Sequence, residues 1–140
     1  MKVDFTIPMR DVINANQREH FHVRAKKTKT LRQLGKKSAE GLVFPDPCRI
    51  IAYFGFPDKR RRDLHNYFGT LKALIDGIVT DAKALPDDSW DHLIGPDLRV
   101  IDYKEKGHLY ICLEIMTEGY SHSPSGSTPG LLSLGLSTTA

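Results

Sequence analysis

The chain has few of the residues that mark several common classes of protein. It contains only two cysteines, Cys48 and Cys112, which lie in apolar stretches without the spacing of a metal site. We therefore expect two buried thiols in a reducing compartment. No apolar run is long enough to span a bilayer, and the first ten residues lack the apolar segment of a signal peptide. We expect a cytoplasmic protein that does not bind a membrane.

Charged residues are missing from the last part of the chain. Residues 121–140 contain no Asp, Glu, Lys or Arg and consist mainly of Ser, Thr, Gly and Pro with a few Leu. Such a segment offers too little apolar surface to order itself, so we expect residues 119–140 to form a disordered tail. Residues 1–118 are long enough to form one domain with its own hydrophobic core.

The charges that are present are unevenly distributed. Residues 1–62 carry 15 Lys and Arg against 6 Asp and Glu, a balance of +9, whereas residues 63–140 carry 5 against 11, a balance of −6. This asymmetry is typical of a basic surface for a polyanion beside a separate acidic site for a metal ion. Two solvated faces of opposite sign would give the same counts, so the charges alone leave both interpretations open.

Alternating and helical patterns predict the elements of the first half. Residues 2–8 alternate apolar and polar side chains, which predicts a strand. Residues 18–40 are rich in Lys, Arg, Ala and Leu and predict one or two basic helices, which end before Pro45. Residues 48–56 are rich in β-forming residues and predict a second strand.

The clearest helix is predicted over residues 63–82. Its apolar stripe, spaced by three and four residues, consists of Leu64, Phe68, Leu71, Ile75 and Ile78. His65, Lys72 and Asp76 share a neighbouring face of this helix. Residues 84–96 have the composition of a loop, and residues 98–103 and 108–116 predict two strands joined as a hairpin.

A basic run leads directly into the predicted helix. Residues 59–62 read Lys-Arg-Arg-Arg, and Asp63 and His65 follow them. Cations attract phosphates and carboxylates hold divalent metals, so this combination suits a nuclease. Each residue also has an ordinary interpretation. Asp63 has the position of a helix N-cap, and Asp87 with Asp88 has the composition of a turn. His65 has an ordinary interpretation as a surface histidine, and Lys72 as a solvated cation.

The order of these motifs resembles the RusA-type crossover-junction endodeoxyribonucleases, a family of Holliday-junction resolvases carried mostly by bacteriophages and prophages. The resemblance rests on the run Pro-Asp-Lys-Arg-Arg-Arg-Asp-Leu-His-Asn at 57–66, on Lys-Ala-Leu-Ile-Asp-Gly at 72–77 and on Leu-Pro-Asp-Asp at 85–88. The segment Asn-Gln-Arg-Glu-His-Phe at 16–21 and the stretch Gly-Pro-Asp-Leu-Arg at 95–99 also fit. It covers residues 1–118.

The resemblance implies a small α/β domain with a mixed β-sheet flanked by helices, which forms a homodimer. It implies nicking of four-way DNA junctions in recombination and repair, dependent on Mg²⁺ or Mn²⁺, with no nucleotide cofactor. If the gene is phage-borne, the protein acts in the cytoplasm of the bacterial host. The residues expected to take part are Asp63, Asp88 and Lys72 in catalysis; Asp63, His65, Asp76, Asp87 and Asp88 at the metal; and Arg18, Arg60, Arg61, Arg62 and Lys72 on the DNA.

His65 departs from the family pattern, in which many members have a second aspartate at this position. Imidazole suits Mn²⁺ better than Mg²⁺, so either Mn²⁺ is preferred or Asp76 takes the place of that aspartate. The departure also leaves open a protein that binds junctions or duplex DNA without cutting them. A further alternative is a small phage structural or regulatory protein whose charged segments are only solvated faces.

Overall fold

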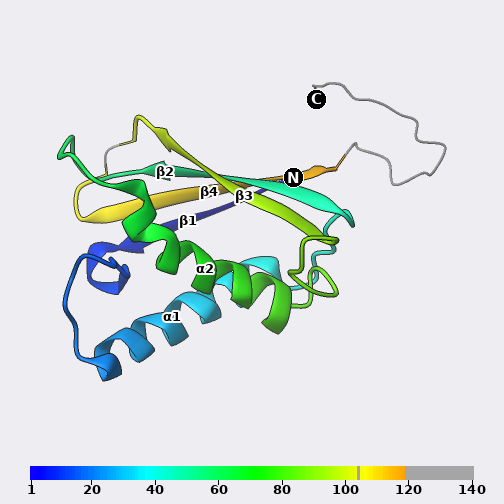
Figure 1. Cartoon of the computed structure of the whole chain (residues 1–140), viewed down its shortest axis with the longest axis horizontal. Coiled ribbons are helices and arrows are strands. Elements are labelled where there is room, and N and C mark those ends of the chain that lie inside the picture. The colour runs from blue at the N-terminus through cyan, green and yellow to red at the C-terminus, as the bar shows by residue number, and fades with distance from the viewer. Residues whose placement is uncertain (104, 119–140) are drawn as a thin grey trace.

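The computed structural model describes residues 1–103 and 105–118, so the tail predicted for residues 119–140 lies outside the described part. The chain forms a small α/β structure in which two helices pack on a four-stranded mixed sheet (Figure 1). Its main elements are β1 (Lys2–Pro8), α1 (Phe21–Ala39), β2 (Cys48–Gly55), α2 (Phe68–Asp76), β3 (Leu93–Ile101) and β4 (His108–Thr117).

The strands lie in the order β1-β4-β2-β3. β4 is antiparallel to both of its neighbours, with Phe5 opposite Ile111 in β1 and Ala52 opposite Leu113 in β2. β3 pairs with β2 in parallel. The predicted hairpin of residues 98–103 and 108–116 is therefore wrong, because β2 lies between the two strands. A turn-like sequence between two strands does not fix which strands become neighbours.

The parallel pairing of β2 and β3 requires a crossover, because the chain must return to the same end of the sheet. Here the crossover contains a 3₁₀ turn at Leu64–Tyr67, then α2, then a π-helical segment at Gly77–Asp81. The single helix predicted over residues 63–82 is thus three segments. Phe68, predicted in the buried stripe, is exposed, whereas Leu71 is fully buried.

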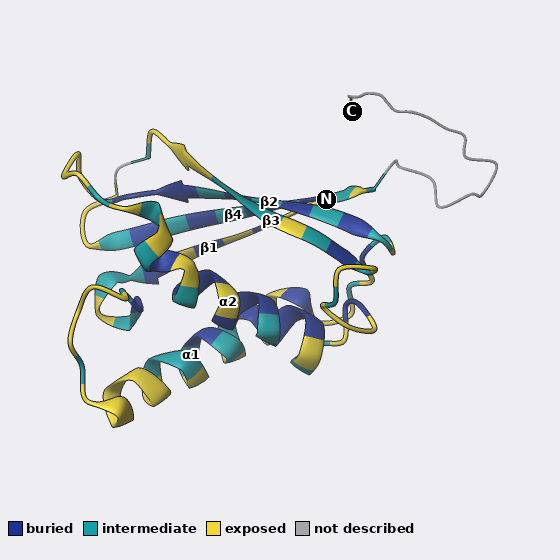
Figure 2. Cartoon of the chain, viewed as in Figure 1, coloured by how far each residue is buried: buried dark blue, intermediate teal, exposed yellow. Residues whose placement is uncertain are grey.

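Both helices cover the same face of the sheet, and the buried side chains lie between the two layers (Figure 2). Alternate residues of β1, β2 and β4 point into this core, as the period of two in the sequence predicts. Cys48 is buried as expected, but Cys112 lies on the opposite face and is half-buried. None of the helices in the described residues has the length and apolar character to cross a membrane.

Two glycines allow the helices to approach closely. A Cβ atom on Gly35 of α1 would collide with the carbonyl oxygen of Leu74, and one on Gly77 would collide with the carbonyl oxygen of Arg32. The backbones therefore meet without side chains between them. This contact fixes α2 against α1 and so fixes the face that α2 turns toward the loop at residues 82–92.

Candidate active site

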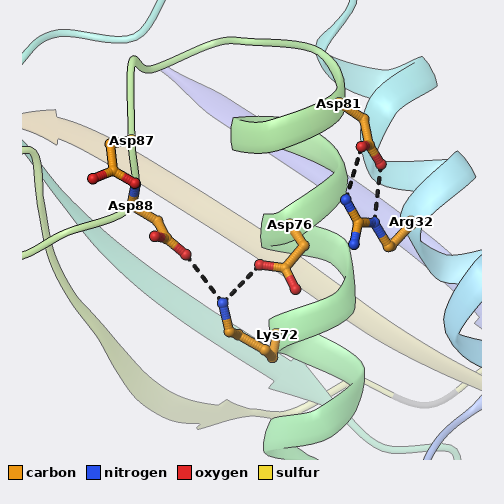
Figure 3. Close-up of polar contacts among 6 residues, drawn as sticks. All are labelled: Arg32, Lys72, Asp76, Asp81, Asp87 and Asp88. Atoms are coloured by element: carbon orange, nitrogen blue, oxygen red, sulfur yellow. Dashed lines mark hydrogen bonds and ion pairs between the residues drawn. The ribbon is translucent and has the colours of Figure 1, made fainter.

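Lys72 of α2 lies between two carboxylates (Figure 3). Its ammonium donates a hydrogen bond to Oδ1 of Asp76, at 2.7 Å, and another to Oδ2 of Asp88, at 3.0 Å. The first contact follows from the helical spacing of four residues, and the second joins α2 to the loop before β3. The hydrogen bond to Asp76, followed by that to Asp88, raises the pKa of Lys72, and Lys72 in turn lowers the pKa of Asp88. Both carboxylates therefore face a fully charged ammonium at neutral pH.

Asp87 shapes the loop that presents Asp88. Its Oδ1 accepts the backbone N–H of Asp88 at 2.8 Å, an arrangement typical of aspartate in turns. The loop is anchored on both sides by the buried residues Leu85 and Leu93. Asp88 is thus held by its neighbour and its anchors, which is why its side chain reaches Lys72 on α2.

A second ion pair lies beside this group and was missed by the sequence analysis. Arg32 of α1 binds Asp81 through two parallel hydrogen bonds, of 3.0 Å from Nε and 2.8 Å from a terminal nitrogen. Figure 3 shows the pair on the side of α2 away from Asp88. The two residues are far apart in sequence, and only the crossing of the helices brings them together. This pair ties the π-helical segment to α1, close to Asp76.

Asp63 and His65 lie at the start of the crossover. Asp63 caps the 3₁₀ turn, because its Oδ1 accepts the backbone N–H of His65 at 3.1 Å. The cap interpretation of Asp63 is therefore confirmed, and it leaves carboxylate lone pairs for another ligand. The His65 ring is 93% exposed and lies 3.5 Å from the same carboxylate. The side chains of these two residues contact each other rather than Lys72 and its carboxylates.

The basic run divides into free and bound cations. Arg60 and Arg61 are exposed, and the guanidinium of Arg60 lies 3.7 Å from Asp58, a long ion pair. Arg62, by contrast, donates to Oδ1 of Asp58 at 2.8 Å and packs over the ring of Phe56. This hydrogen bond holds the pKa of Asp58 at about 2. Arg60 and Arg61 are therefore available to a phosphate, whereas Arg62 mainly stabilises the loop.

Next to this run the surface forms a hollow of about 510 Å³. Its lining includes three cations from two loops: Arg60 and Arg62 from the loop after β2, and Lys106 from the loop before β4. Arg18, the remaining predicted DNA contact, is exposed in the segment before α1. Lys106 could not be assigned to this surface from the sequence, because it lies more than forty residues from the basic run.

Among residues 1–103 and 105–118, no group of three or more His, Cys, Asp and Glu side chains is placed to share a metal ion. The five predicted ligands are thus divided: Asp76 and Asp88 converge on one cation, Asp87 supports Asp88, and Asp63 and His65 lie apart. Two ionised carboxylates around a single positive charge are oxygen donors of the kind that Mg²⁺ and Mn²⁺ bind. By their chemistry, the carboxylates of Asp76 and Asp88 are the described residues that would hold a divalent cation.

Comparison with known proteins does not identify the chain, since no family model matches it and no curated protein does either.

Proposed function

We propose that this protein is a metal-dependent endodeoxyribonuclease of the RusA type, which nicks four-way DNA junctions as a homodimer. The observation that carries the proposal is the convergence of Asp76 and Asp88 on Lys72. Structural ion pairs are common, but this one joins two acidic residues and a lysine that the motif order had already selected. The hydrogen bonds of this group raise the pKa of Lys72 and lower the pKa of Asp88, so each keeps its charge opposite the other at neutral pH.

Residues at the two ends of the crossover would have different roles, in DNA binding and in metal binding. The exposed cations Arg60 and Arg61 would bind DNA phosphates, which supply most of the affinity of such proteins. Asp76 and Asp88 would hold the divalent cation. Asp87 would orient Asp88, because its carboxylate accepts the backbone N–H of Asp88. When bound, the cation would supply the positive charge that phosphodiester hydrolysis needs. Lys72, freed from one carboxylate, would hold a non-bridging oxygen of the cut phosphate.

Selection of the junction would depend on the arrangement of two sites. A dimer with two-fold symmetry presents two identical centres, and a four-way junction offers two nearly equivalent strands. Contacts to phosphates fix position and orientation without reading bases, so recognition would follow the shape of the junction.

The proposal is tested by incubating the protein with a labelled four-way junction and a linear duplex of the same sequence, in Mg²⁺, in Mn²⁺ and in chelator. We expect cutting of the junction only when a metal is present. Asp88→Asn should abolish cutting while junction binding is retained, because the carboxylates serve chemistry and the cations serve affinity. Asp63→Asn tests whether the carboxylate at the start of the crossover takes part as well. Asn is as good an N-cap as Asp, so Asp63→Asn keeps the turn intact.

Different outcomes correct different parts of the proposal. If Asp63→Asn cuts at the wild-type rate, the metal centre is confined to Asp76 and Asp88. If Asp88→Asn cuts at that rate, Asp88 is not a ligand. A wild-type protein that binds junctions but cuts none with either metal is a binding protein and not a nuclease.

A further inference from the structure

The loop that carries Asp88 also carries Trp90, the most exposed of the Trp, Tyr and Phe residues that the structure describes. Trp90 is 78% exposed, compared with 68% for Phe21 on α1. It is the only tryptophan of the chain. Tryptophan is normally largely buried, since it is the side chain with the most apolar surface to remove from water. An indole left in solvent two residues after a candidate catalytic carboxylate is therefore accessible to a ligand bound at that site.

The backbone around Trp90 is held in place. The backbone N–H groups of His92 and Leu93 both donate to the carbonyl oxygen of Ser89 at 2.9 Å, and Ser89 Oγ donates to Asp91. Nδ1 of the His92 ring lies 2.8 Å from Asp46, and the carbonyl oxygen of His92 accepts from Cys48 at the start of β2. An aromatic ring on such a loop loses little conformational entropy when it binds a ligand.

The neighbours of Trp90 decide which ligand fits. Asp87 and Asp88 precede it and Asp91 follows it, and all three are exposed. These carboxylates repel a phosphate, and an apolar protein surface would have to remove them from water at considerable cost. A nucleobase is planar and uncharged, and it presents its face to the indole while its phosphate is held elsewhere. Base stacking on aromatic rings needs no particular base sequence.

We propose that Trp90 is a stacking platform for a nucleobase next to the phosphate that is cut. This inference rests on the proposed nuclease function. That function includes contacts with DNA phosphates only, and the inference adds a contact with a base. At the branch point of a junction the bases stack less firmly than in a continuous duplex, so one of them can turn onto the indole at lower cost. Trp90 would thus favour branched DNA over linear DNA.

The experiment uses the fluorescence of the single tryptophan. The full-length protein is titrated in chelator with an unlabelled junction and with a matched duplex, while binding is followed separately by the anisotropy of a labelled junction. We expect the junction to quench Trp90 in parallel with binding, and the duplex to quench it less. Trp90→Ala should weaken junction binding roughly 5- to 150-fold, the range that the loss of one stacked base gives. Trp90→Phe should retain most of the affinity.

Val100→Ala is the matched control, because Val100 of β3 is also strongly exposed and apolar, and this variant should bind like the wild type. Unchanged fluorescence while anisotropy reports binding would overturn the stacking role and leave the nuclease proposal standing. Fluorescence that changes with protein concentration before DNA is added would place Trp90 between two copies of the chain and overturn it too. A wild type that binds neither DNA would overturn both proposals.

Discussion

Lys72 and its two carboxylates illustrate what a single side chain contributes to the site. One ammonium opposite two carboxylates leaves the group with one net negative charge, so a divalent cation gains from binding there. The partner at Asp76 was predictable, because residues four apart meet on one face of a helix. The partner at Asp88 was not, since its contact depends on the path of a loop sixteen residues further along the chain.

The pairing of His92 with Asp46 predicts a dependence of stability on pH. The hydrogen bond to Asp46 raises the pKa of His92 above its ordinary value of about 6.5. Folding therefore gains from protonated His92 at pH values below the ordinary pKa, and this gain is lost as the pH rises through the raised one. We expect the melting temperature to fall through this window for the wild type. Asp46→Asn should reduce that fall.

Melting curves from about pH 5.5 to pH 8.5 provide the measurement, with His108→Gln as the control for a histidine at the other end of the sheet. The same fall in Asp46→Asn and in the wild type would mean that another group causes it. Because this pair anchors the loop of Trp90, the fluorescence of that residue should report the same transition.

Among the elements, β1, β2 and α1 were predicted close to their observed bounds, because their patterns are local. Val3, Phe5 and Ile7 of β1 alternate with polar residues, and all three are buried. The division of the crossover was not predictable, since the change from 3₁₀ to α to π geometry follows from packing rather than from side-chain period. β3 begins at Leu93, earlier than expected, because Gly95 and Pro96 suggested a loop but lie within an edge strand.

The crossing of α1 and α2 predicts a sharp difference between two glycines. Gly77→Ala should lower the free energy of unfolding by at least about 2 kcal/mol, because the new methyl group meets the backbone of α1 rather than a side chain that can move. Gly69→Ala, in α2, which leads into the segment of Gly77, is the control. Its methyl group would lie 3.2 Å from a methyl of Ile13, which can adjust, so its stability should stay within about 1 kcal/mol of the wild type.

Urea unfolding of both variants measures these differences. A Gly77→Ala variant as stable as the wild type would mean that the two helices can move slightly apart without lowering the free energy of unfolding. That result would also weaken the site geometry, because the position of Lys72 relative to Asp88 depends on how α2 lies on the rest of the fold.

For the chain as a whole, the uneven charge is the feature most directly linked to the proposed function. The balance of +9 over residues 1–62 lies largely on α1 and on the loop after β2, whereas the acidic group lies on the crossover and its following loop. The sequence predicted this separation, but not which cations are free. The structure identifies the available cations, because Asp58 binds Arg62 and leaves Arg60 and Arg61 exposed.

The free cations predict the salt dependence of DNA binding. Replacing both Arg60 and Arg61 with Ala should reduce the slope of log affinity against log salt by about 1.8, since each lost phosphate contact accounts for about 0.9. Lys2→Ala removes an exposed cation from β1, an edge strand, and should leave the slope unchanged. Anisotropy of a labelled junction across a salt series gives these slopes. Equal slopes in all three proteins would place the DNA on another surface.

The central position of β4 also sets the order in which the chain can fold as it is made. β1 has β4 as its only neighbour in the sheet, and Lys2 pairs with Glu114 near the far end of the described residues. The ribosome therefore releases β1, α1 and β2 well before the strand that joins β1 to β2. Until then the apolar residues of β1 have no partner strand, and such exposed strands are prone to aggregate. Synthesis that stalls before His108 would thus leave a nascent chain dependent on chaperones.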